Sequence, residues 1–168
     1  MKIKINPETP RRSALYGAII LIGILLDQLT KLLSVKFLSK VATLPLFEGV
    51  LHLTYVENRG AAFGMLKDHR WVFIILSTVT IIALAIYLFL SREKNRLYGV
   101  AISLIVSGGI GNMIDRLLLG YVVDFIDFRL INFAVFNGAD SFVCIGAALM
   151  ILALIHDLIG ESRKKKNG

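Results

Sequence analysis

Charged side chains occur in this sequence where long apolar runs leave them little contact with water. One stretch, "GGIGNMIDRLLLGYVVDFIDF" at residues 108–128, contains Asp115, Arg116, Asp124 and Asp127, and a further acid, Asp140, follows near the start of the last apolar run. Two carboxylates that meet at a partly dry site cannot both ionise easily, so they share one proton. One acid can then act as a base on a water while its protonated partner polarises a carbonyl, which is the chemistry of an aspartic peptidase.

Asp124 and Asp140 are the pair best placed for this chemistry, since both adjoin the outer ends of neighbouring apolar runs. An acid about two turns inside an apolar run is costly, so a functional role is the default hypothesis for Asp140. Asn137 can cap the turn "NGAD", which places Asp140 in the first turn of the fourth helix. If residues 122–128 are extended, Asp124 and Asp127 point to opposite faces. We therefore expect Asp127 to be a solvated loop charge that does not share the role of Asp124.

Other catalytic chemistries have no matching pattern in the sequence. It contains no HExxH motif, no GxSG-type serine motif and no Cys–His arrangement in the apolar runs, and its three histidines lack metal-ligand spacing. Lys31 has the chemistry to activate a serine, but Ser103 and Ser107 lie too far along the third run and Ser141 is a weak candidate. The sequence thus predicts neither a metal site nor a cofactor, and its single cysteine forms no intrachain disulfide.

Four long apolar runs must position these residues. The chain has 168 residues, of which 56% are hydrophobic, above the ~45–50% that is usual for a soluble domain. The runs predict membrane-spanning helices at about residues 12–37, 71–90, 97–119 and 133–155. The first run is not followed by a small-x-small cleavage site, so we interpret it as a retained span and not as a signal peptide. The predicted fold class is an all-α polytopic membrane protein, with residues 1–168 as a single membrane-embedded domain.

A small sheet is expected beside these helices. In residues 43–66, Pro45 and Gly49 punctuate the chain and "VLHLTYV" alternates as a half-buried strand does. After Gly120, which favours the end of a helix, "YVVDFIDF" has a similar β-branched and aromatic character. We expect the 43–66 segment to form a β-sheet outside the bilayer.

The distribution of basic residues predicts the orientation of the chain. Residues 1–12, 91–97 and 160–168 contain 11 of the 19 Lys and Arg residues within 28 positions. By the positive-inside rule, both termini and the 91–97 loop are cytoplasmic. Anionic lipid on the cytoplasmic leaflet then explains the formal net charge of +7 without a nucleic-acid partner.

Polar side chains from separate segments converge near the outer membrane surface in this arrangement. Asp27 lies ~22 Å along a helix that starts near Arg12, and Asp115 lies ~27 Å along a helix that starts near Leu97. Asp140 enters from the opposite side. The polar group expected at this depth comprises Asp27, Asn58, Asn112, Asp115, Arg116, Asp124 and Asp140.

Several of these residues fit structural roles equally well. Asp115 and Arg116 share one helix face with Asn112, and they are suited to an ion pair or to a helix end as well as to a functional role. Asp27 fits a helix-end residue at the interface, and Asn58 fits a turn former close to Gly60.

Five motifs occur together in the chain: "DQLTK" (27–31), "VENRGAAFG" (56–64), "GGIGNMIDR" (108–116), "VVDF" (122–125) and "FNGAD" (136–140). In this order they resemble the motif set of lipoprotein signal peptidase, the type II signal peptidase of bacteria. The resemblance implies four transmembrane helices, an extracytoplasmic β-cradle, a short surface helix and an aspartic dyad at Asp124 and Asp140. It also implies a prolipoprotein substrate that is cut before a diacylglyceryl-modified cysteine, and inhibition by globomycin.

The resemblance further implies supporting and substrate-positioning roles for Asp27, Lys31, Asn58, Gly60, Asn112, Asp115, Arg116, Asn137 and Ala139. Gly138 departs from the pattern, which has an aliphatic residue there, and this change would loosen the helix start beside Asp140. We expect "GAAFG" to cover the site and to clamp lipid. The chain is expected to be a monomer in the bacterial cytoplasmic membrane, with membrane lipid around it and its dyad near the outer face.

Two other functional classes fit parts of the pattern. A transporter or proton channel would also carry intramembrane carboxylates, but the polar residues cluster on one side and form no chain across the bilayer. A non-catalytic assembly protein would use the glycine-rich third span for packing, and it would have no need of Asp124 and Asp140.

Overall fold

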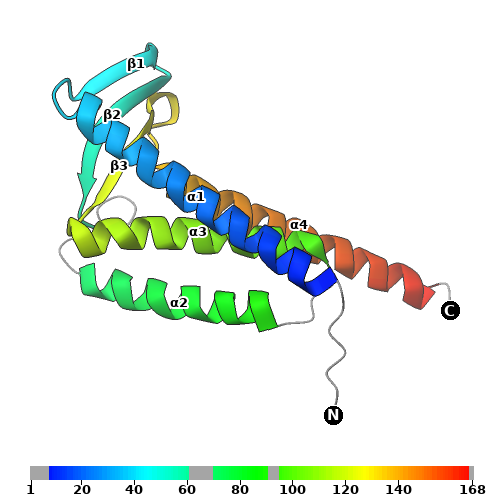
Figure 1. The fold of residues 1–168 in the computed structure, drawn as a ribbon. Helices are drawn as coiled ribbons and strands as arrows, with labels where there is room; N and C mark the ends of the chain where they lie inside the picture. The colour runs from blue at the N-terminus through cyan, green and yellow to red at the C-terminus, as the bar shows by residue number, and fades with distance from the viewer. Residues whose placement is uncertain (1–7, 61–69, 91–94, 167–168) are drawn as a thin grey trace.

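The computed structural model describes residues 8–60, 70–90 and 95–166. Four long helices make up most of it: α1 (Glu8–Leu38), α2 (Arg70–Leu90), α3 (Arg96–Leu118) and α4 (Gly138–Lys166). Each contains a segment that is long and apolar enough to cross a membrane, namely Arg12–Leu38, Trp71–Leu90, Arg96–Leu118 and Gly138–Gly160. The predicted number of four long apolar helices is therefore confirmed, and the helices run side by side along one long direction of the molecule (Figure 1).

Helix α3 is the central element, because it packs against each of the other three helices. Small residues allow α4 to approach it closely. A Cβ added at Gly108 would overlap the backbone carbonyl of Ala139, and one at Gly146 would lie 2.6 Å from the carbonyl oxygen of Ala101. This close packing brings the start of α4 against the second half of α3, where Asn112 and Asp115 lie.

Local signals in the sequence define both ends of α3. At its start, the side chain of Asn95 accepts a hydrogen bond from the backbone N–H of Leu97. At its end, Gly120 adopts a positive φ of 85°, a conformation that suits glycine, and the chain then turns into a strand. The predicted helix stop at Gly120 is thus confirmed, and the turn delivers Asp124 close to the end of α3.

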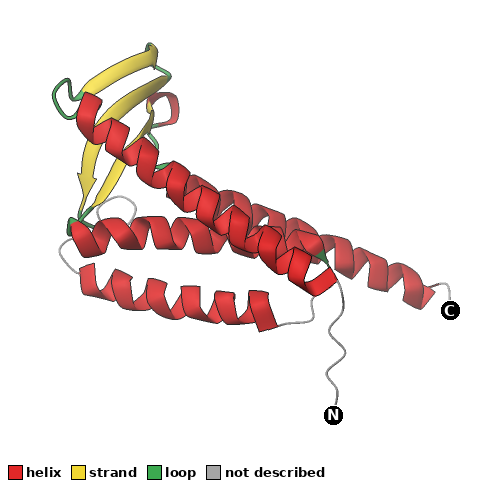
Figure 2. Cartoon of the chain, in the orientation of Figure 1, coloured by secondary structure: helices red, strands yellow, loops and turns green. Residues whose placement is uncertain are grey.

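Three strands form an antiparallel sheet in the order β1 (Thr43–Phe47), β2 (Leu51–Asn58) and β3 (Val122–Phe128). The sheet lies at one end of the helices, next to the C-terminal end of α1, and the first turn of α1 and the last turns of α4 lie toward the other end (Figure 2). In the register, Val56 pairs with Asp124 and Asn58 with Val122, so the last residues of β2 lie next to the acid on β3. The predicted sheet is confirmed, whereas the part of the 43–66 prediction beyond residue 60, including most of "GAAFG", falls outside the described residues.

The fourth helix begins later than the predicted span at 133. The chain first makes a single 3-10 turn at Arg129–Ile131, and Phe136 then forms a β-bridge with Ile126. This backbone pairing keeps the chain extended until Asn137, so α4 starts at Gly138 and Asp140 lies in its first turn. Among the described residues the one short helix is this 3-10 turn, and the surface helix implied by the family resemblance stays a prediction. The first helix also extends beyond the predicted 12–37 at both ends.

Candidate active site

Asp124 lies on β3 and is 1% exposed. Its two carboxylate oxygens accept hydrogen bonds from two side-chain amides, that of Asn58 at 2.9 Å and that of Asn137 at 2.6 Å. Burial raises the pKa of Asp124 to about 7, and the nearby charge of Asp140 adds to this increase, although the two amide hydrogen bonds oppose it. Asp124 therefore exchanges a proton near neutral pH.

Asp140 lies in the first turn of α4 and is partly buried. Its Oδ1 accepts a hydrogen bond from Nδ2 of Asn112 at 2.7 Å, and its Oδ2 accepts one from the backbone N–H of Asn137 at 3.3 Å. In return, the backbone N–H of Asp140 donates to Oδ1 of Asn137 at 2.9 Å. This reciprocal pair is a helix capping box, and it explains why Asn137 and Asp140 are both needed where α4 begins.

Asn137 connects the two acids directly. It is fully buried, and its Nδ2 donates to Oδ1 of Asp124 while its Oδ1 and backbone N–H bind Asp140. The same Nδ2 also donates to Oδ1 of Asn112 at 3.1 Å. One asparagine residue, through its side chain and its backbone N–H, therefore fixes the position of a carboxylate on a strand relative to a carboxylate on a helix.

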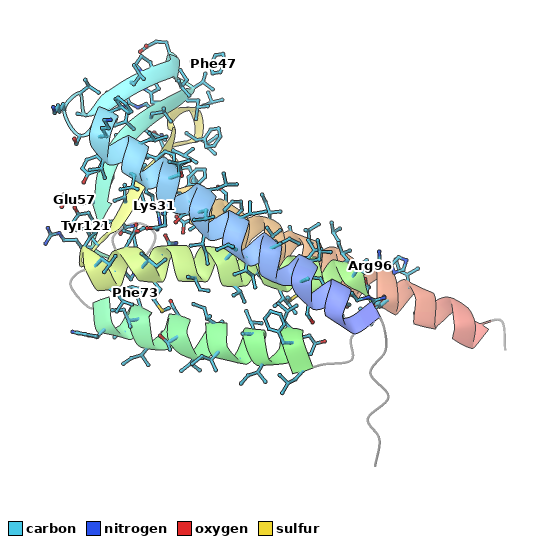
Figure 3. The ribbon with its side chains drawn as sticks, in the orientation of Figure 1. Lys31, Phe47, Glu57, Phe73, Arg96 and Tyr121 are labelled. Atoms are coloured by element: carbon cyan, nitrogen blue, oxygen red, sulfur yellow. The ribbon has the colours of Figure 1, made fainter. Side chains whose placement is uncertain are left out.

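Lys31 provides the positive charge behind this pair. It is 3% exposed, and its Nζ lies 2.9 Å from Oδ2 of Asp27, 3.1 Å from Oδ2 of Asp115 and 2.9 Å from Oδ1 of Asn112. Because Lys31 and Asn137 both donate to the oxygen of Asn112, the amide nitrogen of Asn112 is left to face Asp140. Figure 3 shows Lys31 where α1 meets the strands and α3.

Asp27 and Asp115, the two acids that pair with Lys31, also accept hydrogen bonds from backbone N–H groups next to the other two acids. Oδ1 of Asp27 accepts from the backbone N–H of Ala139 at 2.8 Å, one residue before Asp140. Oδ2 of Asp115 accepts from the backbone N–H of Val123 at 3.0 Å, one residue before Asp124. Asp115 thus pairs with Lys31, and the alternative in which it pairs with Arg116 is not what the structure shows.

The reasoning from sequence missed Gln28. Its Nε2 donates to Oδ1 of Asp115 at 3.0 Å, to the backbone carbonyl of Gly111 at 3.2 Å and to Oδ2 of Asp27 at 3.2 Å. The available signal was a polar side chain next to Asp27 inside an apolar helix. Gly111 is required in this contact, since a Cβ there would come within 2.5 Å of Oδ2 of Asp27.

Asn58, at the end of β2, combines a turn role with a contact to the site. Its Oδ1 accepts from the backbone N–H of Gly60 at 3.0 Å, which turns the amide nitrogen toward Asp124. Gly60 is buried and lies at the edge of the described residues. The turn-former interpretation of Asn58 is therefore confirmed, and the same side chain contacts the acid.

Arg116 lies at the same end of the bundle but faces α2. Its guanidinium is 5.1 Å from the ring centroid of Phe73, and its Nη1 donates a long, 3.5 Å hydrogen bond to the backbone carbonyl of Asn112. Phe73 is labelled beside the sheet end of the bundle in Figure 3. Of the sequence-predicted residues, Arg116 alone is held mainly by an aromatic ring.

Asp127 is not the solvated charge that the sequence suggested. It is 8% exposed, and its Oδ2 accepts hydrogen bonds from Oγ1 of Thr54 at 2.7 Å and from Nε of Arg129 at 3.0 Å. The prediction was wrong because β2 covers this position. The predicted separation of Asp127 from Asp124 is confirmed, since the two acids have different partners on the same strand.

These contacts give a site in which two acids share one asparagine and are enclosed by a buried network. Such an arrangement can hold a single proton between two carboxylates and can activate a water against a carbonyl. The described part of the chain contains no cluster of three His, Cys, Asp or Glu side chains with the geometry to hold a metal ion.

A family model described as Signal peptidase (SPase) II, Peptidase_A8, matches residues 19–156. The chain belongs to the signal peptidase II family. This is an aspartic peptidase family, and the matched segment contains both Asp124 and Asp140 together with the network around Lys31. Asp124 and Asp140, which the structure brings together, thus both lie within the residues that the family model matches.

Relatives and solved structures agree with this membership of the signal peptidase II family. Proteins named lipoprotein signal peptidase are 49% identical in Caldanaerobacter subterraneus subsp. tengcongensis, over 76% of this chain and 86% of that one, and 45% identical in Clostridioides difficile, over 90% and 99%. Two solved structures described as bacterial membrane enzymes superpose with TM-scores of 0.78 and 0.77 at 34% and 35% identity. They cover 86% of this chain and 90% and 94% of their own, so the chain is a multi-pass bacterial membrane protein.

Proposed function

We propose that Asp124 and Asp140 are the catalytic dyad of this signal peptidase. The activity itself follows from family membership: the chain removes signal peptides from prolipoproteins. The observation that carries the assignment of the dyad is the position of Asn137, which binds both carboxylates: its side-chain Nδ2 donates to Asp124 and its backbone N–H donates to Asp140.

The dyad acts on the scissile bond with one shared proton. The ionised acid removes a proton from a water, and the resulting hydroxide adds to the carbonyl carbon while the protonated acid donates a hydrogen bond to the carbonyl oxygen. Collapse of the tetrahedral intermediate then breaks the C–N bond, and the departing amine takes up a proton from the pair. A pKa of about 7 for Asp124 suits this chemistry, since the pair keeps a proton at neutral pH.

The remaining polar residues position the dyad and the substrate. Asn58, Asn112 and Asn137 orient the carboxylates with amide hydrogen bonds. The ion pairs of Lys31 hold the segments that carry the dyad, through the backbone N–H groups next to each acid. The supporting set is Asp27, Lys31, Asn58, Gly60, Asn112, Asp115, Arg116, Asn137 and Ala139.

The substrate is a prolipoprotein whose cysteine carries a diacylglyceryl group, and the bond before that cysteine is cut. Four spans place both termini on one side of the membrane, and the density of Lys and Arg in the terminal segments makes that side cytoplasmic. The sheet, whose strand β3 carries Asp124, lies at the end of the bundle away from the first turn of α1 and the last turns of α4, and this end is then the outer face (Figure 1). A lipid-anchored cysteine at the outer surface reaches this level without leaving the membrane.

Residues 1–168 act as a single membrane-embedded domain without a cofactor. The chain works as a monomer surrounded by membrane lipid, since the acids and amides of the site all come from one chain. The family resemblance also makes globomycin an expected inhibitor of the chain.

The test uses purified enzyme in detergent with a lipid-modified prolipoprotein. Asp124→Asn and Asp140→Asn are each expected to abolish cleavage, a loss of at least about a thousandfold, because neither variant can share a proton between two carboxylates. Both variants are expected to fold and to bind globomycin at least weakly. Asp127→Asn, an acid on the same strand with other partners, is the matched control and retains cleavage. Normal turnover by either dyad variant removes that residue from the dyad.

A further inference from the structure

Arg116 is a half-buried cation near the dyad, and an aromatic ring holds it although three carboxylates act on it. It interacts electrostatically with Asp140 on α4, Asp124 on β3 and Asp115 on α3. Within the described residues, none of these carboxylates forms an ion pair with Arg116. Asp115 pairs with Lys31 instead. The guanidinium lies 5.1 Å from the ring centroid of Phe73, and its Nη1 is 3.5 Å from the backbone carbonyl oxygen of Asn112.

We propose that Phe73 is a positioning residue that holds Arg116 beside the dyad and keeps it from pairing with either acid. The proposal rests on the dyad assigned above. An arginine that binds a carboxylate in a bidentate ion pair strongly favours the ionised form. A pair of acids with such a partner would lose the shared proton that the reaction needs. A ring that attracts the guanidinium keeps its positive charge near the site without this consequence.

The packing of α2 fixes Phe73 in the required place. Phe73 lies in the first turn of α2, at the end of the bundle that contains the dyad. One turn further, Oγ1 of Thr78 lies 3.3 Å from Sδ of Met113 on α3. Next along the helix, a Cβ at Gly109 would come within 3.1 Å of Ile81, so α2 and α3 are in close contact there. These contacts set the position of the ring relative to Arg116.

The charges that face the guanidinium decide where it goes when the ring is lost. Lys31 on α1 pairs with Asp115, so of the three carboxylates that act on Arg116 the two of the dyad have no ion pair among the described residues. Without the ring, Arg116 is expected to move toward Asp124 and Asp140. The dyad would then lose its shared proton at a lower pH than in the wild type.

The experiment measures kcat, KM and the pH profile of cleavage for Phe73→Leu and Phe73→Tyr. Leucine has a similar volume but no ring, whereas tyrosine keeps the ring. We expect Phe73→Leu to lower kcat by about three- to tenfold, in line with the loss of a cation–π contact, with little change in KM. We also expect the alkaline limb of its pH profile to shift to lower pH by at least ~0.5 unit. Phe73→Tyr is expected to retain the wild-type kcat and limb.

A matched control and a double-mutant cycle separate this role from a structural one. Phe89→Leu removes an exposed ring at the other end of α2 and is expected to leave kcat and the pH profile unchanged. In an Arg116→Gln background, Phe73→Leu is expected to cause no further change, because the ring then has no cation to hold. If Arg116→Gln has no measurable turnover, the shift of the alkaline limb in Phe73→Leu but not in Phe73→Tyr decides the question.

The proposal is overturned if Phe73→Leu keeps the wild-type alkaline limb, or if its loss of kcat is undiminished in the Arg116→Gln background. An equal effect of Phe73→Leu and Phe73→Tyr also overturns it. The dyad assignment fails separately, through cleavage by Asp124→Asn or Asp140→Asn, so the two failures are distinguishable.

Discussion

Asp124 and Asp127 lie three positions apart on β3 and are both buried, but their partners differ in kind. Asp124 accepts hydrogen bonds from the neutral amides of Asn58 and Asn137. Asp127 accepts one from the hydroxyl of Thr54 and one from the guanidinium of Arg129. Burial raises the pKa of Asp124 to about 7, whereas for Asp127 the hydrogen bonds and the charge of Arg129 outweigh burial and lower the pKa.

The difference shows what makes a buried acid reactive. Neutral amides orient a carboxylate without removing the cost of its charge, so the acid can still hold a proton. A cation in direct contact removes that cost and fixes the ionised form. In this chain the buried cation Lys31 pairs with Asp27 and Asp115 and not with the dyad, so it stabilises the fold and leaves the dyad free to titrate.

The largest expected effect is on the free energy of unfolding, and it distinguishes Lys31, the buried cation near Asp124, from Arg129, the cation that binds Asp127. Lys31→Met leaves Asp27 and Asp115 buried without their partner, so we expect a loss of about 3–5 kcal/mol in the free energy of unfolding, together with a loss of cleavage. Arg129→Met removes a half-exposed partner of Asp127 and is expected to cost at most about 1 kcal/mol. Thermal unfolding in detergent measures both. Equal losses in the two variants would contradict the distinction between a buried and a surface cation.

Some of this contrast was predictable from sequence. The alternation of side chains along residues 122–128 gave opposite faces to Asp124 and Asp127, and the apolar runs gave the four spans. The alternation carried no information on what covers each face, however. Asp127 is buried because Thr54, seventy-three positions away, belongs to the neighbouring strand.

The network around Lys31 and the start of α4 could not be predicted from the sequence, because both depend on contacts between distant parts of the chain. Lys31 pairs with Asp115, eighty-four positions along the chain and on another helix, and nothing in either motif gives that pairing by itself. The run from 133 looks like part of a span because it is apolar. Only the bridge from Phe136 to Ile126 shows that it is extended, and that bridge exists because β3 is folded beside it.

The next prediction concerns the pH dependence of stability. Between the ordinary pKa of 3.8 and about 7, the folded chain keeps a proton on Asp124 that the unfolded chain has released. Asp124 therefore makes stability fall as pH rises through this window. Asp124→Asn is expected to remove this slope and to raise stability at pH 8 by about 1–3 kcal/mol, at the expense of activity.

Asp127 is expected to have the opposite dependence. Its lowered pKa contributes stability above the ordinary value, and this contribution is lost as pH falls toward and below it. Asp127→Asn should therefore lower stability at neutral pH by about 0.5 kcal/mol and have no effect in strong acid. Melting temperatures of both variants from pH 3 to pH 9 check this, and slopes of the same sign would refute the assignment of the two environments.

The last prediction separates the hydrogen-bond donors of the two acids. Asn58→Ala removes the amide that favours the ionised form of Asp124, so the alkaline limb of the pH profile should move to higher pH, with kcat lowered about tenfold. Thr54→Val removes a donor to Asp127 and should cost about 1 kcal/mol of stability without moving either limb. Each variant removes a neutral donor to an acid of the same sheet, together with one other hydrogen bond of the same side chain, to Gly60 for Asn58 and to Thr43 for Thr54. A shift of the limb in Thr54→Val, or its absence in Asn58→Ala, would mean that the proton shared in catalysis is not controlled by the donors to Asp124.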